Sequence, residues 1–423
     1  MTVIRNPLEP WIAAKIGVPP EALSREVLEA YQFRRLRQTI AYVKERSSYY
    51  REKLRGVDPE EIAGYEQFAR LPFTAPEELQ IQPQRLVCTS QQEIARIVTL
   101  QSSGTTGPGK RLYFTREDQE LTIDFFDHGM RNLVGPGDRV MILLPGQTPG
   151  SVGDLLKIGL ARLGAVPVPY GLVEDPGEAL AAALKEDVNA LVGIPVQVLS
   201  LARHREGRAL RGRLKSILLS TDYVPRALCR VLEDTWGCRV FHHYGMTEMG
   251  LGGGVQCPAR QGYHLREADL FFEIVDPVTG EPVPDGVTGE VVFTTLTRTG
   301  MPLIRYRTGD LSRFIPEGCA CGTVLKSLDL VQGRLAGRVR LGNQALSLPE
   351  MDEVLFGLEG LVDYQVTLVR GPGKSVLQVE VQAGEGRAVD RDAVVAALAA
   401  IPAVRDLWPD QLEIRVSQGQ LPR

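Results

Sequence analysis

Between residues 24 and 55, apolar side chains recur every three or four positions. This spacing places them on one face of a helix, where they can pack against a core. The stripe consists of Phe33, Leu36, Ile40 and Val43. Ser24 precedes it and carries a hydroxyl suited to capping the first turn. The pattern predicts one scaffolding helix over residues 24–55.

Residues 138–245 alternate between continuous apolar runs and amphipathic stretches. The predicted strands are Arg139–Pro145, Val166–Gly171, Val188–Pro195, Leu214–Ser220 and Cys238–Gly245. The predicted helices are Val152–Ala165, Glu178–Asp187, Val196–His204 and Pro225–Trp236. This alternation favours a parallel sheet with helices on its faces. Ligands of such sheets bind beyond the carboxyl ends of the strands, which here are followed by the loops after Pro145, Ser220 and His243.

The pattern changes after residue 270. Short runs (LFFEIVD, GEVVFTTL and PLIRYR) separated by turns rich in proline and glycine predict antiparallel strands over 270–315. From about residue 333 a small α+β unit is expected. Its elements are a helix at Leu348–Leu355, strands at Tyr364–Leu368 and Val376–Val381, a helix at Arg391–Ala400 and a strand at Leu412–Val416. The fold class predicted from these patterns is α/β.

The composition narrows the class of protein. The chain has 423 residues, enough for two or three domains, with 43% hydrophobic and 24% charged residues. A net charge of −4 implies no polyanionic partner, so we expect no nucleic acid. The sequence contains no apolar run long enough to span a bilayer, and its N-terminus lacks the apolar region of a signal peptide. No membrane partner and a cytoplasmic location are therefore expected.

The stretch 101–110, QSSGTTGPGK, combines three glycines with two serines and two threonines. Such a loop turns N–H groups and hydroxyls toward a ligand and suits a polyphosphate. Gly104, Gly109 and Lys110 have the spacing of a P-loop. However, Arg111 replaces the hydroxyl residue that would hold magnesium, and the following RLYFT alternates like a strand. The stretch is either a phosphate loop of another kind or a surface turn.

Two further motifs carry candidate chemistry. In YGMTE, Tyr244 can stack on a base, Thr247 can donate to a phosphate, and Glu248 can hold Mg²⁺. A helix-opening turn explains the same residues. In MPLIRYRTGDL, Asp310 follows a tight turn and can accept both hydroxyls of a ribose, or it can bond its own backbone in a hairpin turn. The two arginines of this motif bind phosphate or pair with internal carboxylates.

The six cysteines do not form the framework of a secreted protein. Three thiols and an imidazole have a spacing compatible with tetrahedral zinc: Cys257, His264, Cys319 and Cys321. We favour a structural zinc site over free reduced cysteines. Four protein ligands would close the site to catalysis. The remaining thiols, Cys88, Cys229 and Cys238, are expected in the core.

The motifs SSGTTGPGK, YGMTE and YRTGD, in this order, resemble those of the adenylate-forming superfamily of acyl-CoA synthetases. The likeness is greatest to the phenylacetate–CoA ligases, through SREVLEAYQFRRLRQTIAYVKERSSYYREKL, FTTLTRTGMPLIRYRTGDL and GRLAGR (Gly333–Arg338). The resemblance implies a large domain over 1–333 with mainly parallel sheets and a β-rich subdomain at about 250–330. It also implies a small, mobile α+β domain over 338–423 that is shorter than in relatives.

The resemblance also implies a two-step reaction. A carboxylate attacks the α-phosphate of ATP, and coenzyme A then displaces AMP from the acyl-adenylate. The residues carried over to the β- and γ-phosphates are Ser102, Ser103, Gly104, Thr105, Thr106, Gly107 and Lys110. Tyr244 and Gly245 would line the adenine pocket, Thr247 would reach the α-phosphate, Glu248 would hold Mg²⁺ and Asp310 would bind ribose. Lys110, Thr247 and Glu248 are the implied catalytic residues.

Further expectations concern the adenine loop, the domain junction and the partners. The sequence STD (Ser220–Asp222) stands where the family has a GAE-like adenine loop, and Arg338 would lie at the domain junction near the nucleotide. Expected partners are a small carboxylic acid and coenzyme A, with a homodimer as one expected assembly. The acid is an aryl acid such as phenylacetate or a compact acyl acid. Tyr170, His242, His243 and Met246 are candidates for its pocket, although packing also explains a strand-end histidine.

Two departures from the family pattern bear on activity. The family hinge reads GRxDD, whereas here Gly337–Arg338 runs directly into VRLGNQALSLPE. Relatives also continue past LPR into a segment with a catalytic lysine, and losing one such charge typically slows a step by about 10²–10³. The alternatives are therefore a degenerate protein that binds a nucleotide or acyl-adenylate and an adenylating enzyme that loads a carrier-protein thiol.

Overall fold

The computed structural model describes residues 6–100, 109–371 and 373–421. The chain forms two compact units. Unit 1 comprises residues 1–135, 147–164 and 243–331, and unit 2 comprises residues 136–146, 165–242 and 332–423. Each unit is thus assembled from segments far apart in the sequence. The domain boundary expected between residues 333 and 338 stays a prediction.

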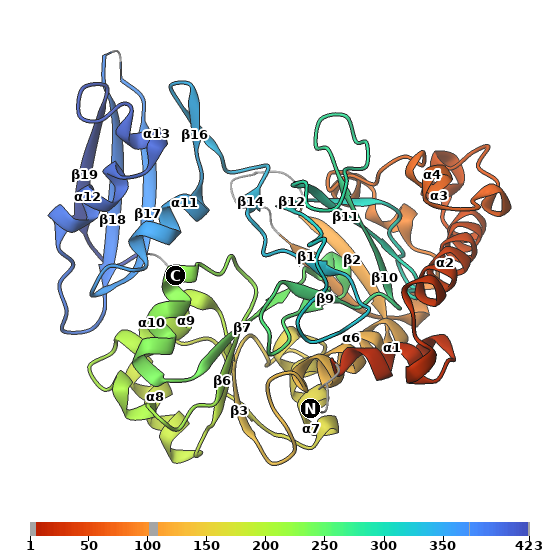
Figure 1. The fold of residues 1–423 in the computed structure, drawn as a ribbon, viewed down its shortest axis with the longest axis horizontal. Coiled ribbons are helices and arrows are strands. Elements are labelled where there is room, and N and C mark those ends of the chain that lie inside the picture. The colour runs from red at the N-terminus through yellow and green to blue at the C-terminus, as the bar shows by residue number, and fades with distance from the viewer. Residues whose placement is uncertain (1–5, 101–108, 372, 422–423) are drawn as a thin grey trace. The chain divides into compact units, whose positions relative to one another are not determined.

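Unit 2 contains the parallel sheet that the alternating pattern predicts (Figure 1). Its strands are β3 (Arg139–Leu143), β4 (Val166–Pro169), β5 (Ala190–Gly193), β6 (Ser216–Leu219) and the first part of β7 (Arg239–Tyr244). They lie in the order β7-β6-β5-β3-β4, and all neighbours are parallel. The chain between them forms α7 (Val152–Leu163), α8 (Pro176–Lys185), α9 (Pro195–Arg203), the 3₁₀ turn η5 (Gly207–Leu210) and α10 (Arg226–Trp236). The predicted α/β class is confirmed.

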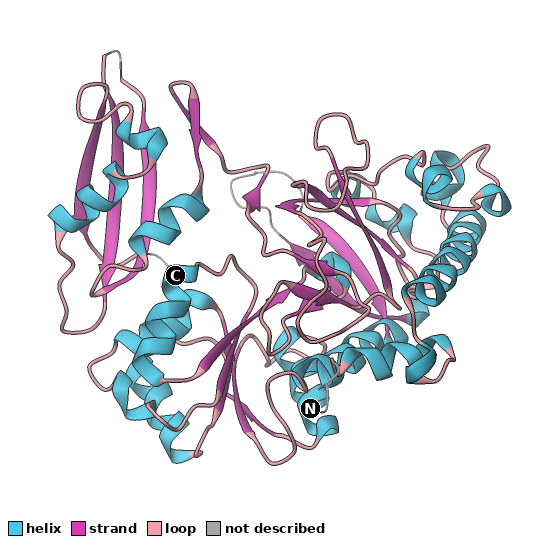
Figure 2. Cartoon of the chain, in the orientation of Figure 1, coloured by secondary structure: helices cyan, strands magenta, loops and turns pink. Residues whose placement is uncertain are grey.

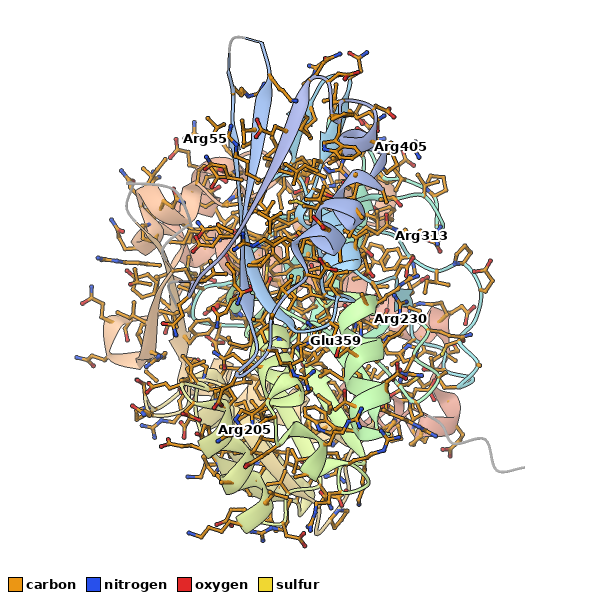
Figure 3. All side chains as sticks on the ribbon, turned by 90° about the vertical axis from the view of Figure 1, so that its left-hand side faces the viewer. Arg55, Arg205, Arg230, Arg313, Glu359 and Arg405 are labelled. Carbon is orange, nitrogen blue, oxygen red and sulfur yellow. The ribbon has the colours of Figure 1, made fainter. Side chains whose placement is uncertain are left out.

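The C-terminal part of unit 2 is the α+β segment expected from the sequence (Figure 2). Its elements are β14 (Gly333–Arg334), β15 (Val339–Leu341), β16 (Gln344–Leu346), α11 (Leu348–Leu355), β17 (Leu361–Val369), β18 (Ser375–Ala383), α12 (Arg391–Ala399), α13 (Pro402–Arg405) and β19 (Leu412–Gln418). β18 pairs with β17 in an antiparallel manner and with β19 in a parallel manner. Highly exposed charges such as Arg205 and Glu359 lie on this unit (Figure 3).

Unit 1 combines N-terminal helices with antiparallel strands. Its helices are α1 (Leu8–Ile16), α2 (Arg25–Arg46), α3 (Ser48–Lys53), α4 (Tyr65–Ala69), α5 (Glu78–Ile81), α6 (Arg116–Met130) and α7, with 3₁₀ turns at η1 (Pro20–Ala22), η2 (Pro59–Glu61), η3 (Pro83–Leu86), η4 (Gln91–Glu93) and η6 (Thr247–Met249). Its strands are β1 (Ile94–Leu100), β2 (Lys110–Thr115), β8 (Gly254–Val255), β9 (Tyr263–Leu265), β10 (Leu270–Val275), β11 (Gly289–Thr295), β12 (Tyr306–Ser312) and β13 (Ser327–Leu328).

The prediction of one helix over 24–55 is wrong, because the helix breaks at Ser47. Ser24 caps α2 as expected, its Oγ accepting from the Val27 N–H at 3.3 Å. Ser47 is extended, and its Oγ accepts from the N–H of Tyr50 at 3.2 Å, so it caps a second helix, α3. The same hydroxyl donates to the carbonyl of Arg85 at 2.7 Å. The break is therefore held by a residue far away in the sequence.

The antiparallel sheet β10-β11-β12 confirms the change of pattern after residue 270. However, the strand expected over 302–307 begins only at Tyr306. Arg305 has a φ of +46°, outside the range of a strand. The N–H of Ile304 donates to the Tyr50 hydroxyl at 3.0 Å instead of to a neighbouring strand. Tertiary contacts therefore override the local strand pattern here.

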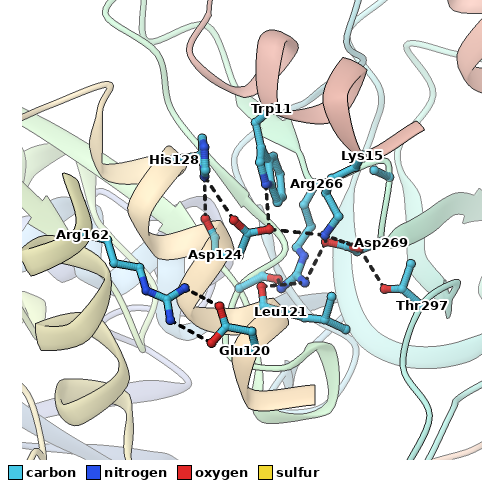
Figure 4. Close-up of polar contacts among 12 residues, drawn as sticks. Trp11, Lys15, Glu120, Leu121, Asp124, His128, Arg162, Arg266, Asp269 and Thr297 are labelled. Carbon is cyan, nitrogen blue, oxygen red and sulfur yellow. Dashed lines mark hydrogen bonds and ion pairs between the residues drawn. The ribbon is translucent and has the colours of Figure 1, made fainter. Parts of the chain in front are cut away.

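A polar network joins α1 to α6 (Figure 4). The Trp11 indole donates to Asp124 at 2.8 Å, and Lys15 donates to Asp269 at 2.8 Å. Burial alone would raise the pKa of Asp124, but hydrogen bonds from His128 and Trp11 outweigh it and lower that pKa to about 2. The first described helix is thus anchored by charge as well as by packing.

Each unit has its own apolar core. Trp236 is fully buried in the core of unit 2, and Phe68 is fully buried in that of unit 1. Leu36, Ile40 and Val43 from the predicted stripe of α2 are also fully buried, which confirms that face. In the described part of the chain, no helix is long and apolar enough to cross a membrane.

Candidate active site

The glycine- and hydroxyl-rich loop is the first candidate. Ser102, Ser103, Gly104, Thr105, Thr106 and Gly107 lie outside the described residues. The structure resumes at Gly109, where a Cβ atom would lie 2.7 Å from the carbonyl oxygen of Leu100, so only glycine fits. Lys110 then begins β2 and pairs with Leu100 of β1. The strand predicted after the loop is confirmed, in contrast to the helix of a P-loop.

Lys110, Glu248 and Tyr306 meet in unit 1 from β2, η6 and β12. Lys110 forms an ion pair with Oε1 of Glu248, whose side chain is only 3% exposed. The Tyr306 hydroxyl donates to the same oxygen at 3.0 Å, and Lys110 Nζ lies 3.5 Å from that hydroxyl. Burial and the Glu248 charge raise the pKa of Tyr306, so the hydroxyl remains a donor. Tyr306 lies within the motif MPLIRYRTGDL but was not predicted to have a role in the site.

Tyr244 and Asp310 form a second buried pair in the same unit. The Tyr244 hydroxyl donates to Oδ2 of Asp310 at 3.1 Å. Burial, and then the Asp310 charge, raise the pKa of Tyr244. The Asp310 charge makes a smaller contribution to the rise in the pKa of Tyr306, after burial and Glu248. The alternative of a hairpin turn at Asp310 is wrong, because the residue lies within β12.

The turn after β7 depends on Gly245. A Cβ atom at this position would lie 2.7 Å from the carbonyl oxygen of Leu251 and 2.9 Å from Cα of Gly252. Glycine therefore lets the chain fold back after β7, where the N–H of Gly253 donates to the Tyr244 carbonyl at 2.9 Å. The expected adenine contact of Gly245 stays a prediction.

Thr247, the threonine of the YGMTE motif, is half-buried and is the first residue of η6. The alternative of a helix-opening turn therefore describes the local backbone correctly. The same short turn carries Glu248 into the group described above. The phosphate contact expected of Thr247 stays a prediction.

Arg298 contacts the backbone of Glu248 and was not singled out from the sequence. Its guanidinium donates to the backbone carbonyl of Glu248 at 2.8 Å and lies 4.9 Å from the centre of the Phe114 ring. Burial lowers its pKa to about 10. Asp118 accepts from the N–H of Gly300 at 3.0 Å and thereby holds the segment that carries the arginine. Arg298 lies within FTTLTRTG, so the motif contained the signal but not the contact.

The two arginines of MPLIRYRTGDL pair with internal carboxylates, which is one of the two expected alternatives. Arg305 donates to both oxygens of Glu273, at 3.0 and 2.9 Å, and both side chains are fully buried. Arg307 Nε donates to Glu290 at 2.7 Å. Both arginines are therefore engaged in ion pairs within the protein.

The two adjacent histidines occupy different surroundings. In unit 2, Nε2 of His242 lies 3.2 Å from Sγ of the buried Cys229. In unit 1, the His243 ring lies 6.1 Å from the ring of Phe125 and 6.2 Å from that of Phe126, centre to centre. Burial and a nearby arginine lower the pKa of His243 to about 4, so the ring is neutral near pH 7.

Three predicted nucleotide contacts belong to unit 2. Ser220 is buried just after β6, and the exposed Asp222 accepts from the N–H of Tyr223 at 2.8 Å. Arg338 is exposed between β14 and β15. Their roles toward a nucleotide stay predictions.

The four predicted metal ligands come together in unit 1. The ligand atoms of Cys257, His264, Cys319 and Cys321 all lie within 4.8 Å of one another. The two sulfurs of Cys257 and Cys319 are 3.7 Å apart, and Cys321 Sγ is 3.4 Å from Nε2 of His264. The other ring nitrogen of His264 lies 3.3 Å from the Ser327 hydroxyl, which orients the ring.

Comparisons with known proteins give the family. Residues 40–297 match the family described as AMP-binding enzyme. The phenylacetate-coenzyme A ligase of Thermus thermophilus is 32% identical over 377 residues, covering 85% of this chain and 83% of the relative. That of Escherichia coli is 26% identical, covering 87% and 85%. A crystal structure of 2-hydroxyisobutyryl-CoA ligase in the postadenylation state aligns with a TM-score of 0.78 at 21% identity, covering 93% of this chain and 87% of that chain.

The family match spans more than half of the chain, and the Thermus relative exceeds 30% identity over most of its length. The structural match at 21% identity shows a shared fold. The chain therefore belongs to the AMP-binding, adenylate-forming enzymes, in the branch of the phenylacetate–CoA ligase-like, AMP-forming acyl-CoA ligases.

Proposed function

We propose that this protein activates an aryl acid, or another compact carboxylic acid, as an acyl-adenylate and transfers the acyl group to coenzyme A. The observation that carries this proposal is the meeting of Lys110 and Glu248 with the Tyr244–Asp310 pair in one unit. The first pair offers a cation and a hard carboxylate for a polyphosphate, and the second offers an aromatic ring and an acceptor for a nucleoside.

In the adenylation step, charge develops on phosphate oxygens, so the residues act by positioning and by electrostatics. The Lys110 ammonium binds the β- and γ-phosphates of the departing pyrophosphate. Asp310 accepts hydrogen bonds from ribose hydroxyls, and Tyr244 lines the adenine. Thr247 donates to the α-phosphate under attack by the substrate carboxylate.

Glu248 is the residue proposed to hold Mg²⁺. Its carboxylate is nearly fully buried and already accepts positive charge from Lys110, so the donor chemistry fits a hard cation. When bound, magnesium supplies neutralising charge for the phosphates. Tyr306 keeps the carboxylate oriented through its hydrogen bond.

The proposal of an aryl substrate is supported by local chemistry. The rings of Phe125 and Phe126 lie near the neutral ring of His243, the residue that directly precedes Tyr244 in the sequence. Aromatic surroundings favour the ring of an aryl acid over a more polar substrate. The ligases named for phenylacetate among the relatives support the same class.

The test is a screen of the full chain with ATP, Mg²⁺, coenzyme A and a panel of phenylacetate, benzoate and 2-hydroxyisobutyrate. AMP, pyrophosphate and an acyl-CoA thioester should appear in equal amounts, most rapidly with an aryl acid. ATP binding without turnover of any acid would favour a binding protein. Acylation of a phosphopantetheine carrier without saturation by coenzyme A would favour carrier loading.

Two variants connect the activity to the site. Glu248→Gln should lower kcat by about 10²–10³ because it removes a charge used in the transition state. Asp310→Asn should act mainly on the KM for ATP. The matched control is Glu281→Gln, which changes an exposed glutamate of the same unit. Equal kinetics for all three variants would refute the assignment of these residues.

We also propose a structural Zn²⁺ at the Cys257, His264, Cys319 and Cys321 cluster. Tetrahedral zinc with bonds of about 2.3 Å places two sulfurs roughly 3.8 Å apart. The observed sulfur separation of 3.7 Å fits that geometry. Four protein ligands leave no open position, so the ion would join the β9 region to the 319–321 turn and take no part in catalysis.

A further inference from the structure

We infer that Lys110 and a divalent cation compete for the Glu248 carboxylate, so that cation binding releases Lys110 toward the nucleotide. This inference rests on the proposed function. It concerns which positive charge neutralises the Glu248 carboxylate before the nucleotide binds. Glu248, Lys110 and Tyr306 are all described residues of unit 1.

We expect competition because the Glu248 carboxylate that would bind the cation is already bound by Lys110. Lys110 and Tyr306 both donate to Oε1 of Glu248, whose side chain is 3% exposed. A buried carboxylate needs a compensating charge, and Lys110 supplies it here. A divalent cation bound to the same carboxylate would face the ammonium across a few ångströms in a site of low dielectric constant. The two positive charges therefore favour alternative occupation of the carboxylate.

The two donors to Glu248 differ in their freedom to move. Tyr306 is 1% exposed, and its ring lies 5.4 Å from that of Phe293, centre to centre. It is fixed in the core and holds the carboxylate in either state. The Lys110 side chain is 19% exposed and extends on a flexible four-carbon stem from the first residue of β2. Lys110 is therefore the donor that can leave.

The consequence is that the binding of the divalent cation and the binding of the nucleotide affect each other. With Lys110 on Glu248, the charges of these two side chains compensate each other. Once a divalent cation takes the carboxylate, the ammonium is available to a phosphate. By thermodynamic reciprocity, the cation and the nucleotide then strengthen each other's binding, and such couplings typically reach 5–150-fold. A salt bridge without exchange leaves only the smaller coupling that direct contact between the cation and the phosphates supplies.

The test measures Mn²⁺ binding to the nucleotide-free full chain by electron paramagnetic resonance. Lys110→Met should bind Mn²⁺ at least about tenfold more tightly than wild type, because the competitor is gone. The same variant should bind a non-hydrolysable ATP analogue more weakly, and its coupling between Mn²⁺ and the analogue should be smaller than in wild type. Glu248→Gln should lose Mn²⁺ binding. Lys326→Met, which alters a lysine stacked on Phe314 in the same unit, is the matched control and should match wild type.

A second measurement avoids any variant. Mass spectrometry should show that Mg²⁺ increases the rate at which an amine-reactive reagent modifies Lys110 of wild type. Unchanged or weaker Mn²⁺ binding in a folded Lys110→Met variant, or undetectable Mn²⁺ binding in every variant, would overturn the inference. So would a modification rate independent of Mg²⁺. Tighter Mn²⁺ binding in Lys110→Met, together with no turnover of any acid by the wild-type protein, would instead support the competition and contradict the proposed function.

Discussion

Replacement of Arg305 by methionine should strongly destabilise unit 1. The Arg305 side chain is 1% exposed and donates twice to Glu273, which is fully buried. The guanidinium also donates to the carbonyl of Leu71 at 2.6 Å and lies 4.1 Å from the centre of the Phe73 ring. Methionine retains much of the packing volume but supplies neither the charge nor the hydrogen bonds.

The expected loss is about 3–5 kcal/mol of unfolding free energy, the usual result of removing one partner of a buried ion pair. Burial already raises the pKa of Glu273, and Arg305 opposes that rise. Without Arg305 the folded-state pKa rises further above the unfolded value. A raised carboxyl pKa makes the folded state bind the proton more tightly, so stability is retained below about pH 4.5 and lost as pH rises through the folded pKa. The deficit of the variant should therefore grow between pH 5 and pH 7.5.

Urea unfolding, followed by circular dichroism at pH 5 and pH 7.5, measures both effects. The double variant Arg305→Met/Glu273→Leu should recover most of the loss, because no buried charge remains. The stability of the double variant relative to wild type should change less with pH than that of the single variant. A loss below 1 kcal/mol in the single variant, or a double variant less stable than the single one, would refute the reasoning.

Three other perturbations test separate parts of unit 1. Cys257→Ser should release zinc and lower the melting temperature, measured by elemental mass spectrometry and calorimetry; an equal zinc content in variant and wild type would contradict the metal site. Because its pKa is lowered, Asp124 should contribute about 1–2 kcal/mol to the free energy of unfolding, and this contribution should be lost as pH falls from about 4 toward 2. The pKa of His128 is raised, so its contribution should be lost as pH rises above about 6.5. Melting curves of Asp124→Asn and wild type between pH 2 and 9 should therefore differ most from pH 4 to 6.5, and parallel curves would exclude this pair. Gly252→Ala would place Cβ 2.5 Å from a phenyl carbon and should cost about 1–3 kcal/mol with reduced turnover, whereas Gly135→Ala, with open space around it, should not.

The sequence was most informative where local pattern and tertiary environment agree. The strands β5 and β6 are buried at every position, so their apolar runs directly reflect a parallel sheet covered on both faces. The break at Ser47 was not predictable in the same way. The apolar period continues through Tyr50 and Leu54, and the contact that fixes the break comes from the carbonyl of Arg85.

In the candidate site, too, some residues could be identified from the sequence and others only from their contacts in the fold. Glu248 and Asp310 were identified because each belongs to a short motif, YGMTE and YRTGD, that can be recognised in the sequence. Tyr306 and Arg298 were not identified, because an internal tyrosine or arginine acquires its role only from the partner that the fold supplies. The alternatives for Arg305 also remained equal until the structure placed Glu273 opposite it.

The motif YRTGD gains a physical explanation from an irregularity in β12. Between Arg307 and Leu311 the strand holds more residues than its partner does between Glu290 and Val292. Thr308 and Gly309 occupy this bulge, where the Thr308 hydroxyl donates to the Val291 carbonyl at 2.7 Å and the Gly309 N–H donates to Glu290 at 3.0 Å. Gly309 has a φ of +76°, which favours glycine. Bulges re-aim side chains, and this one directs Asp310 to Tyr244 while Tyr306 reaches Glu248. The threonine and glycine of the motif therefore build the backbone that the tyrosine and aspartate require.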